Sequence, residues 1–206
     1  MSHSALRSTL IVSLLVALLA FAAGRTTAGD VPLSKRDAER FQQKVLLINK
    51  YALTGTGPAR TAVTESEVNS YLAFVARDQM PDGVVDPYVS ILGTGRLSAR
   101  AVVDLDGVRR QHAPGGWLDP MSYLTGRLPV SATGVLSTNN GVARFQLESA
   151  QVSGIPIPKT VLQQVLSYYS RTASNPQGLN LDDPFPLPAR IREIQVVRPG
   201  EAIVVQ

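Results

Sequence analysis

The chain has 206 residues, of which 44% are hydrophobic, and this is enough to bury the core of one domain. It contains no cysteine, which excludes a disulfide framework, a lipidated N-terminal cysteine, a thiolate metal site and a cysteine nucleophile. Its net charge is only +4 and the charges are scattered, so the sequence does not indicate binding to nucleic acid.

Residues 1–28 are typical of a secretory signal peptide. A short polar stretch ends in Arg7, and the apolar run from Leu10 to Ala23 is shorter than the about 20 residues that span a bilayer. Cleavage would follow Ala22 or, at a weaker site, Ala28. The alternative is an uncleaved N-terminal anchor. In both cases we expect one exported domain over residues 29–206, located in the periplasm or cell envelope and membrane-tethered if the leader is kept.

The segment from Ser34 to Leu53 predicts a first helix. Apolar residues repeat at i, i+4 and i+7 from Phe41, and Ser34 with Asp37 suits a helix start. The run VLLI within this segment could also form a strand. The glycines and proline of TGTGPAR, from Thr54, end the segment.

A second helix is predicted to begin at Thr64. Thr64 as N-cap and Glu67 three residues later form a capping box, in which each side chain satisfies a backbone N–H of the other residue. The motif MPDG, from Met80, ends the helix. The helical spacing places four apolar residues in one stripe: Val68, Tyr71, Leu72 and Val75.

The middle of the chain predicts antiparallel strands. In RLSARAVVDLD, from Arg96 to Asp106, apolar and polar residues alternate with one exception at Val102, which predicts a strand with one face in solvent. Further on, Asn139-Asn140-Gly141 predicts a hairpin, because both turn residues must tolerate a positive φ. The residues expected on the apolar face are Leu97, Ala99, Ala101, Val103 and Leu105 of the first strand, Val130, Ala132 and Gly134 of the second, and Phe145 and Leu147 of the third.

A strand-to-helix junction follows in SGIPIPKTVLQQVL, from Ser153. Gly154 permits a sharp bend as the strand ends, and the two prolines keep the residues before them extended. Pro158 suits a helix start because its missing N–H costs nothing there. We expect this helix, from Pro158 to Tyr169, to lie back across the apolar side of the sheet. Its apolar face consists of Val161, Leu162, Val165, Leu166 and Tyr169.

The C-terminal part begins with a proline-rich strap, residues 175–190. Prolines at every second position from Pro184 to Pro188 exclude a central strand and favour extended backbone. The segments IREIQVV and AIVVQ then flank Pro199-Gly200 and predict a last hairpin with a type II turn.

The sequence carries no recognisable catalytic motif. His112 is the one histidine outside the leader, and no G-x-S-x-G motif accompanies it, so we interpret it as a solvated loop residue. An exported hydrolase that uses His112 is a weaker alternative. One histidine without cysteine leaves zinc without its usual ligands, and Asp182-Asp183 suits a turn better than a catalytic or calcium-binding pair. We therefore expect no enzyme activity, no catalytic residue, no metal and no cofactor.

The predicted apolar face allows two interpretations. Its central residues are small, so that helices could approach closely and fill the space, and composition alone favours such a filled core. The same small residues could instead leave an elongated groove for an acyl chain. Burial of about ten methylenes at roughly 0.8 kcal/mol each is worth on the order of 8 kcal/mol before association costs.

Parts of the chain resemble a known family. The segments TESEVNSYL, GRLPVSATG and VSGIPIPKTVLQQVL resemble the secreted phospholipid-binding proteins called LmeA-like, relatives of the tubular lipid-binding (TULIP, BPI-like) domains. The resemblance is clearest between Arg127 and Leu166. It implies an α+β fold in which a long, strongly curved antiparallel sheet wraps around amphipathic helices and encloses an apolar tunnel. It offers no ligand signature, and the strap and the first helix have no counterpart in it.

We therefore expect a non-enzymatic exported protein that binds or shuttles a phospholipid or another acyl-chain lipid, with transient membrane-surface contact and no nucleic acid partner. The alternative is a structural or interaction protein of the cell envelope with a filled core and no ligand. From the facing of side chains alone, the expected lipid contacts are Val68, Tyr71, Leu72, Val75, Leu97, Ala99, Ala101, Val103, Val130, Ala132, Phe145, Leu147, Val161, Leu162, Val165 and Leu166.

Overall fold

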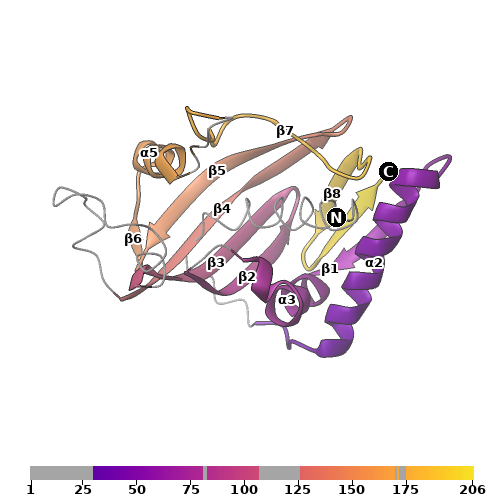
Figure 1. Cartoon of the computed structure of the whole chain (residues 1–206), viewed down its shortest axis with the longest axis horizontal. Coiled ribbons are helices and arrows are strands. Elements are labelled where there is room, and N and C mark those ends of the chain that lie inside the picture. Colours follow the sequence, from indigo (N-terminus) through magenta and orange to yellow (C-terminus); the bar gives the residue numbers. More distant parts are fainter. Residues whose placement is uncertain (1–29, 81–82, 107–125, 170, 172–174) are drawn as a thin grey trace.

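The computed structural model describes residues 30–80, 83–106, 126–169, 171 and 175–206, and its main element is a large antiparallel sheet with helices beside it (Figure 1). The expected α+β class is confirmed. Among the described residues, no helix combines the length and the apolar character that a membrane crossing needs. The predicted leader and the His112 loop lie outside the described residues.

In chain order the elements are α2 (Lys35–Thr54), β1 (Arg60–Thr64), α3 (Glu65–Phe74), the short 3-10 helix η1 (Arg77–Gln79), β2 (Val84–Gly93), β3 (Arg96–Asp104), β4 (Arg127–Asn139), β5 (Val142–Val152), β6 (Ile155–Pro156), α5 (Lys159–Tyr169), β7 (Phe185–Pro186), β8 (Glu193–Arg198) and β9 (Glu201–Val205).

The described strands form two antiparallel sheets. The larger has the order β2-β3-β4-β5-β6, and β7 pairs with the other end of β5 along the same edge. The smaller has the order β1-β9-β8. The hairpin predicted around Pro199-Gly200 is confirmed, with Gly200 at φ 78°, and it forms the smaller sheet with β1. The sequence pattern does not predict β1, because its short run RTAVT lies between a breaker and a helix start.

Helix α2 begins where its sequence predicts. The hydroxyl of Ser34 accepts a hydrogen bond from the backbone N–H of Asp37 at 3.0 Å, and this caps the helix. The run VLLI is helical and not a strand. Val45 and Ile48 are buried while Leu46 and Leu47 are exposed, which is the spacing of a helix with one buried face. The buried face of the helix consists of Ala38, Phe41, Val45 and Ile48.

Helix α3 covers the outer edge of the larger sheet. The predicted capping box is present, with Glu67 accepting from the N–H of Thr64 at 2.9 Å. The side-chain amide of Asn69 exchanges two hydrogen bonds with the backbone of Val89 in β2, at 2.7 and 2.8 Å. Because β2 is an edge strand, these bonds pair backbone groups that the sheet itself leaves open.

The long strands of the larger sheet follow the predicted alternation with one shift. The β4–β5 hairpin is confirmed, and its turn residues Asn140 and Gly141 have φ of 48° and 82°. The register changes between Thr133 and Gly134, so that Glu148 is an extra residue on β5 and forms a β-bulge. Apolar residues before and after the bulge therefore lie on the same face.

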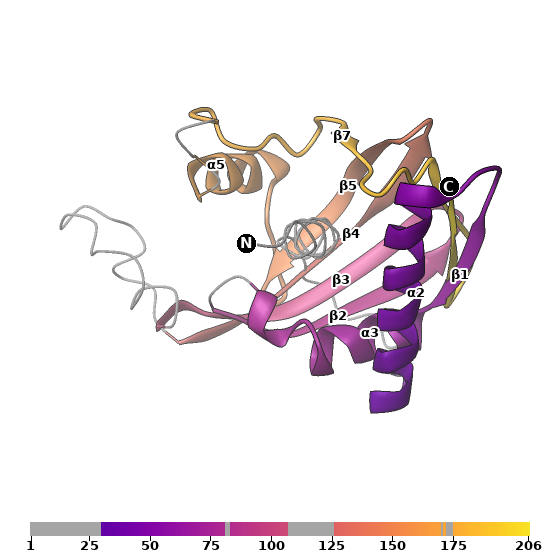
Figure 2. The same cartoon turned by 45° about the vertical axis from the view of Figure 1, so that its right-hand side comes forward.

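Helix α5 lies beside the β5–β6 edge of the sheet, away from α2 and α3 (Figure 2). Ser153 and Gly154, both at positive φ, form the turn from β5 into β6, and the first helical hydrogen bonds begin at the carbonyl of Pro158, as predicted. The helix does not lie across the whole apolar side as expected. It packs through Leu162 on small residues of β4 and β5.

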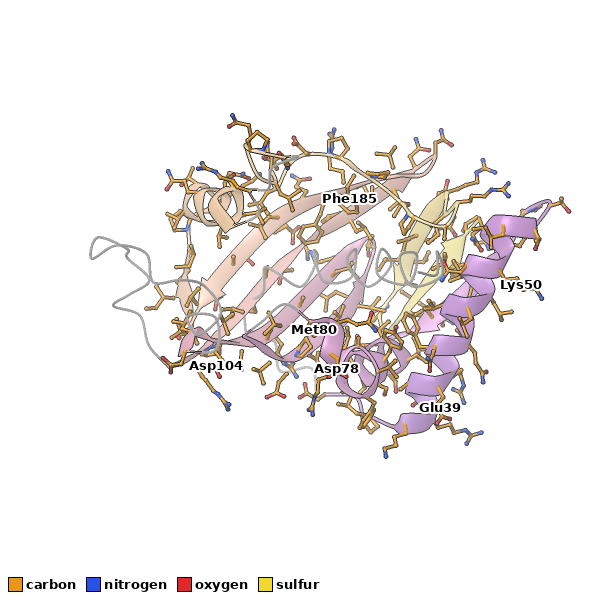
Figure 3. All side chains as sticks on the ribbon, in the orientation of Figure 1. Glu39, Lys50, Asp78, Met80, Asp104 and Phe185 are labelled. Carbon is orange, nitrogen blue, oxygen red and sulfur yellow. The ribbon has the colours of Figure 1, made fainter. Side chains whose placement is uncertain are left out.

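The strap over residues 175–190 runs along α5 and then along the edge of β5. The side chain of Gln163 in α5 donates to the carbonyl of Leu179 at 3.0 Å and accepts from the N–H of Leu181 at 2.7 Å. Further along, Phe185 and its neighbour pair with the start of β5 as β7 (Figure 3). The predicted exclusion of the proline-rich segment from a central strand position is thus confirmed.

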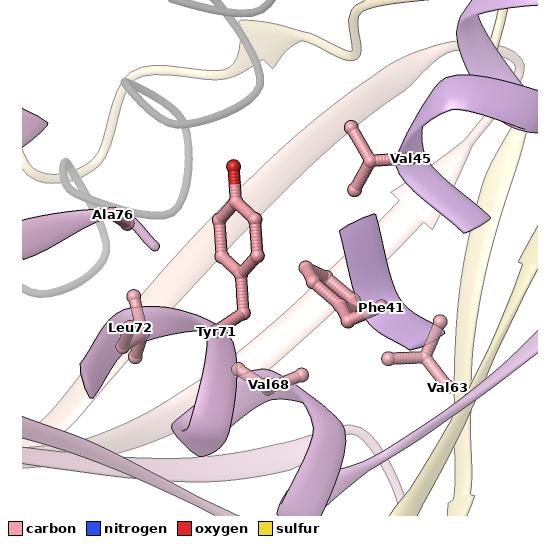
Figure 4. Close-up of a cluster of buried hydrophobic side chains, with 7 residues drawn as sticks. All are labelled: Phe41, Val45, Val63, Val68, Tyr71, Leu72 and Ala76. Carbon is pink, nitrogen blue, oxygen red and sulfur yellow. The ribbon is translucent and has the colours of Figure 1, made fainter. Parts of the chain in front are cut away.

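The hydrophobic core is divided into clusters. The one between α2 and α3 is shown in Figure 4 and consists of Phe41, Val45, Val63, Val68, Tyr71, Leu72 and Ala76. A second joins α2, the hairpin end of β4 and β5, and the strap, and consists of Ile48, Leu136, Ala143, Leu187 and Ile191. A small third cluster, Ala132 and Ala150, lies under Leu162 of α5.

Candidate functional site

One face of the larger sheet carries apolar and small side chains across β3, β4 and β5. Residues that pair directly across antiparallel strands share a face, so the register defines three rows. The rows are Leu97, Gly134 and Leu147; Ala99, Ala132 and Ala150; and Ala101, Val130 and Val152. We call these nine residues the apolar face.

The apolar face is covered unevenly. Ala101, Ala132 and Ala150 are buried, with exposures of 5%, 2% and 6%. Leu97, Ala99, Val130 and Leu147 are only half-buried. The middle row, Ala99, Ala132 and Ala150, has little side-chain volume, because each residue contributes a single methyl group. The three rows thus form a continuous apolar strip, and the side chains in its middle row are short.

One end of this strip is filled by the protein itself. A Cβ built on Gly134 would lie 2.5 Å from the ring of Phe145, so the glycine provides the space that the phenylalanine ring occupies. The second core cluster continues from there, with Leu136 packed against Ile48 of α2 and Leu187 of the strap. Of the two interpretations of the small residues, this end therefore supports the filled core, because Phe145 of the neighbouring strand fills the space above Gly134.

The predicted residues of α3 lie in the core cluster with α2. Val68, Tyr71 and Leu72 are 8%, 7% and 2% exposed, and the ring of Tyr71 meets that of Phe41 edge-on at 5.1 Å (Figure 4). Burial raises the pKa of the Tyr71 hydroxyl above its ordinary value. Val75 is the C-cap of α3, which ends earlier than the predicted Met80. This cluster packs against Ala99, and so reaches the apolar face from the β2 side.

The predicted residues of α5 lie at the opposite side of the apolar face. Leu162 and Leu166 are half-buried, and Val161 is 44% exposed. The side chain of Val165 lies outside the described part of the structure. Of the remaining predicted contacts, Val103 is a half-buried residue near the end of β3. The structure therefore brings the sheet residues together with Leu162, and it places the α3 residues in a separate cluster.

The other face of the larger sheet is polar, as the alternation predicts. The Arg96 guanidinium pairs with the Glu148 carboxylate at 2.8 Å, and Arg100 stacks 4.0 Å from the centre of the Tyr88 ring. Burial raises the pKa of the Tyr88 hydroxyl. The hydroxyl of Ser131 is buried without a hydrogen-bond partner among the described residues. The sheet thus separates a polar layer from the apolar face.

A pocket of about 400 Å³ lies at the C-terminal end of α2, apart from the apolar face. Its lining is largely polar, and no sequence pattern predicts it, because its residues come from four distant segments of the chain. The carboxamide of Gln206 is held there by the carbonyl groups of Ile48 and Ala189, at 3.0 and 2.6 Å. The lining residues are Tyr51, Gly57, Asn140, Gly141, Leu187, Arg190, Ile191, Arg192 and Gln206.

Asp182 and Asp183 lie in a turn of the strap. Asp182 pairs with Lys159 of α5, and its N–H binds the side chain of Asn180, which is the turn role expected for Asp182-Asp183. Within the described ranges, no group of three histidine, cysteine or acidic residues is placed to hold a metal ion.

No protein-family model and no curated protein matches this chain. Among solved structures, a crystal structure of lipopolysaccharide binding protein is weakly similar, with 18% sequence identity and a TM-score of 0.21. The match covers 71% of this chain and 40% of that protein. A likeness at this level carries no argument about the fold or the ligand of this chain, and the family resemblance remains an expectation from the sequence.

Proposed function

We propose that this protein is an exported, non-enzymatic protein of the periplasm or cell envelope that binds or shuttles an acyl-chain lipid on the apolar face. The single observation that carries the proposal is the continuous apolar strip over β3, β4 and β5, which α5 covers only in part. The resemblance of the sequence to the LmeA-like and TULIP families supports the proposal, because it implies a curved antiparallel sheet that encloses an apolar tunnel.

In this proposal the row of three alanines forms the floor for the lipid tail. Leu162 of α5 contacts the tail from one side and the α3 cluster approaches from the other. A tail of about ten methylenes would gain on the order of 8 kcal/mol from burial before association costs. This amount suits reversible binding, so that the protein can take up a lipid and release it without a chemical step.

Lipid uptake is tested with Leu147→Gln, which places a carboxamide on the apolar face. We expect about a tenfold or greater loss of fluorescent fatty-acid uptake, because the tail would have to desolvate the new polar group. Val142→Gln is the matched control, since Val142 is on the same strand and 47% exposed on the polar side. Solvent extraction of the purified wild-type protein, followed by mass spectrometry, would identify a carried lipid. A folded wild-type protein that yields no lipid and takes up none would refute the proposal.

A structural or interaction protein with a filled core is the second candidate. The filling of the Gly134 space by Phe145, and the cluster of Leu136, Ile48 and Leu187 next to it, favour this candidate at one end of the strip. Its expected signature is stable association with another cell-envelope component together with no lipid uptake.

A further inference from the structure

The outer side of α2 carries exposed leucines in its C-terminal half. Leu46, Leu47 and Leu53 are 59%, 62% and 63% exposed, and they lie away from the buried face of the helix. Lys50, labelled in Figure 3, is also exposed. In the sequence of the helix it follows Leu46 and Leu47 by about one turn and precedes Leu53 by about one turn. Apolar side chains gathered on an otherwise polar helix face are typical of a surface that contacts another body.

A basic pocket adjoins these leucines at the end of the helix. Tyr51, one turn after Leu47, lines the 400 Å³ pocket. A guanidinium nitrogen of Arg190 donates to the carbonyl of Gly55, the C-cap of α2, at 3.3 Å, and so holds the pocket next to the helix. Arg192 lines the same pocket. In the described part of the chain, neither arginine forms an ion pair with a carboxylate.

We propose that these residues form a docking surface for an anionic lipid membrane. The leucines enter the boundary between headgroups and acyl chains, and the cations contact the phosphate groups above it. The proposal goes beyond lipid binding on the apolar face, because it concerns the outer side of α2. The docking surface consists of Leu46, Leu47, Lys50, Leu53, Arg190 and Arg192.

Charge complementarity favours a membrane over a second copy of the chain. A two-fold contact brings the same patch of both copies together, so that three cations would face three cations. Phosphate groups of an anionic bilayer attract the same three charges, by about 1 kcal/mol, or roughly fivefold in binding, for each.

The apolar part is tested with the triple variant Leu46→Gln, Leu47→Gln and Leu53→Gln in a vesicle flotation assay. The vesicles contain phosphatidylcholine alone or with phosphatidylglycerol. We expect about a tenfold or greater loss of binding to the anionic vesicles, because the variant inserts no leucine. The matched control changes two exposed apolar residues elsewhere, Ile155→Gln and Val197→Gln, which are 65% and 69% exposed, and should bind as the wild type does.

The basic part is tested with the double variant Lys50→Gln and Arg192→Gln. We expect a loss of roughly 25-fold on anionic vesicles and none on neutral vesicles, since about fivefold is lost for each charge. Lys35→Gln is the control, because Lys35 is exposed on the same helix at its other end. Glycerol phosphate serves as a soluble probe, and we expect it not to displace the protein from vesicles at millimolar concentration.

Three results would overturn this inference. The triple variant could bind anionic vesicles as the wild type does, glycerol phosphate could occupy the pocket without any need for a membrane, or sedimentation could show a dimer that the triple variant abolishes. The fatty-acid uptake assay separates this inference from the proposed function. Loss of uptake in Leu147→Gln with unchanged flotation, and the reverse in the triple variant, are expected if both are right.

Discussion

Glu67 is a buried carboxylate between α2 and α3, with an exposure of 1%. Its oxygens accept hydrogen bonds from the ammonium group of Lys44 at 2.7 and 2.8 Å, and Lys44 also donates to the carbonyl of Ala62. We predict that Lys44→Met lowers the free energy of unfolding by about 2 kcal/mol, because the buried carboxylate loses its ammonium partner and keeps only the N–H of Thr64 and the Arg40 guanidinium at 3.9 Å. Urea unfolding measures the change. Lys35→Met, at an exposed position of the same helix, should change it by less than about 0.5 kcal/mol. Equal losses in both variants would contradict the pairing.

Asp37 makes stability depend on pH at the start of α2. Hydrogen bonds from the hydroxyls of Ser34 and Ser66 hold the pKa of its carboxyl below the ordinary value of 3.8. A group whose pKa is lower in the folded state stabilises the fold above its unfolded pKa, and this stability is lost as the pH falls through the folded pKa. We predict that Asp37→Asn lowers the free energy of unfolding at pH 6, and that its difference from the wild type shrinks below about pH 4. Urea titrations at several pH values test this, and a difference independent of pH would contradict it.

At the scale of elements, α5 and the strap depend on each other. Among the described side chains of α5, Leu162 packs on the sheet and Gln163 binds the strap. These hydrogen bonds therefore hold α5 against the strap near the edge of the sheet.

We predict that Gln163→Ala loosens the strap locally. The N–H of Leu181 would lose its acceptor, and its hydrogen-exchange protection should fall by about tenfold, the equivalent of one hydrogen bond. Exchange in the core of α3 should not change. Gln164→Ala is the matched control, since Gln164 is the exposed neighbour in the same helix. If both variants leave the exchange of Leu181 unchanged, the bond does not hold the strap.

Elements whose signals are local could be predicted from the sequence. The capping box of Thr64 and Glu67, the Asn140-Gly141 turn and the start of α5 at Pro158 each depend on residues a few positions apart. The alternation in β3 also predicts which side chains face inward. These patterns are sufficient for the fold class and for most of the apolar face, but not for Ala150 and Val152, because the bulge at Glu148 shifts the alternation on β5.

At the scale of the whole molecule, features that depend on distant partners escaped prediction. Strand β1 needs β9 as its partner, and the role of Asn69 is visible only once Val89 lies beside it. The candidate site shows the same limit. The alternation predicts that Gly134 lies on the apolar face, but it does not predict that Phe145 of the neighbouring strand fills the space above it. The pocket at the end of α2 joins four segments, so no local pattern predicts it.

The pairing of β1 with β9 also has a consequence for biogenesis. These strands are adjacent in space, although almost the whole domain separates them along the chain. As the polypeptide is synthesised, β1 has no neighbour until the β8–β9 hairpin has emerged, and closure of such a long loop is slow. Because Val63 of β1 belongs to the core cluster of α2 and α3, we expect this cluster to complete its packing only after the C-terminal hairpin has been synthesised.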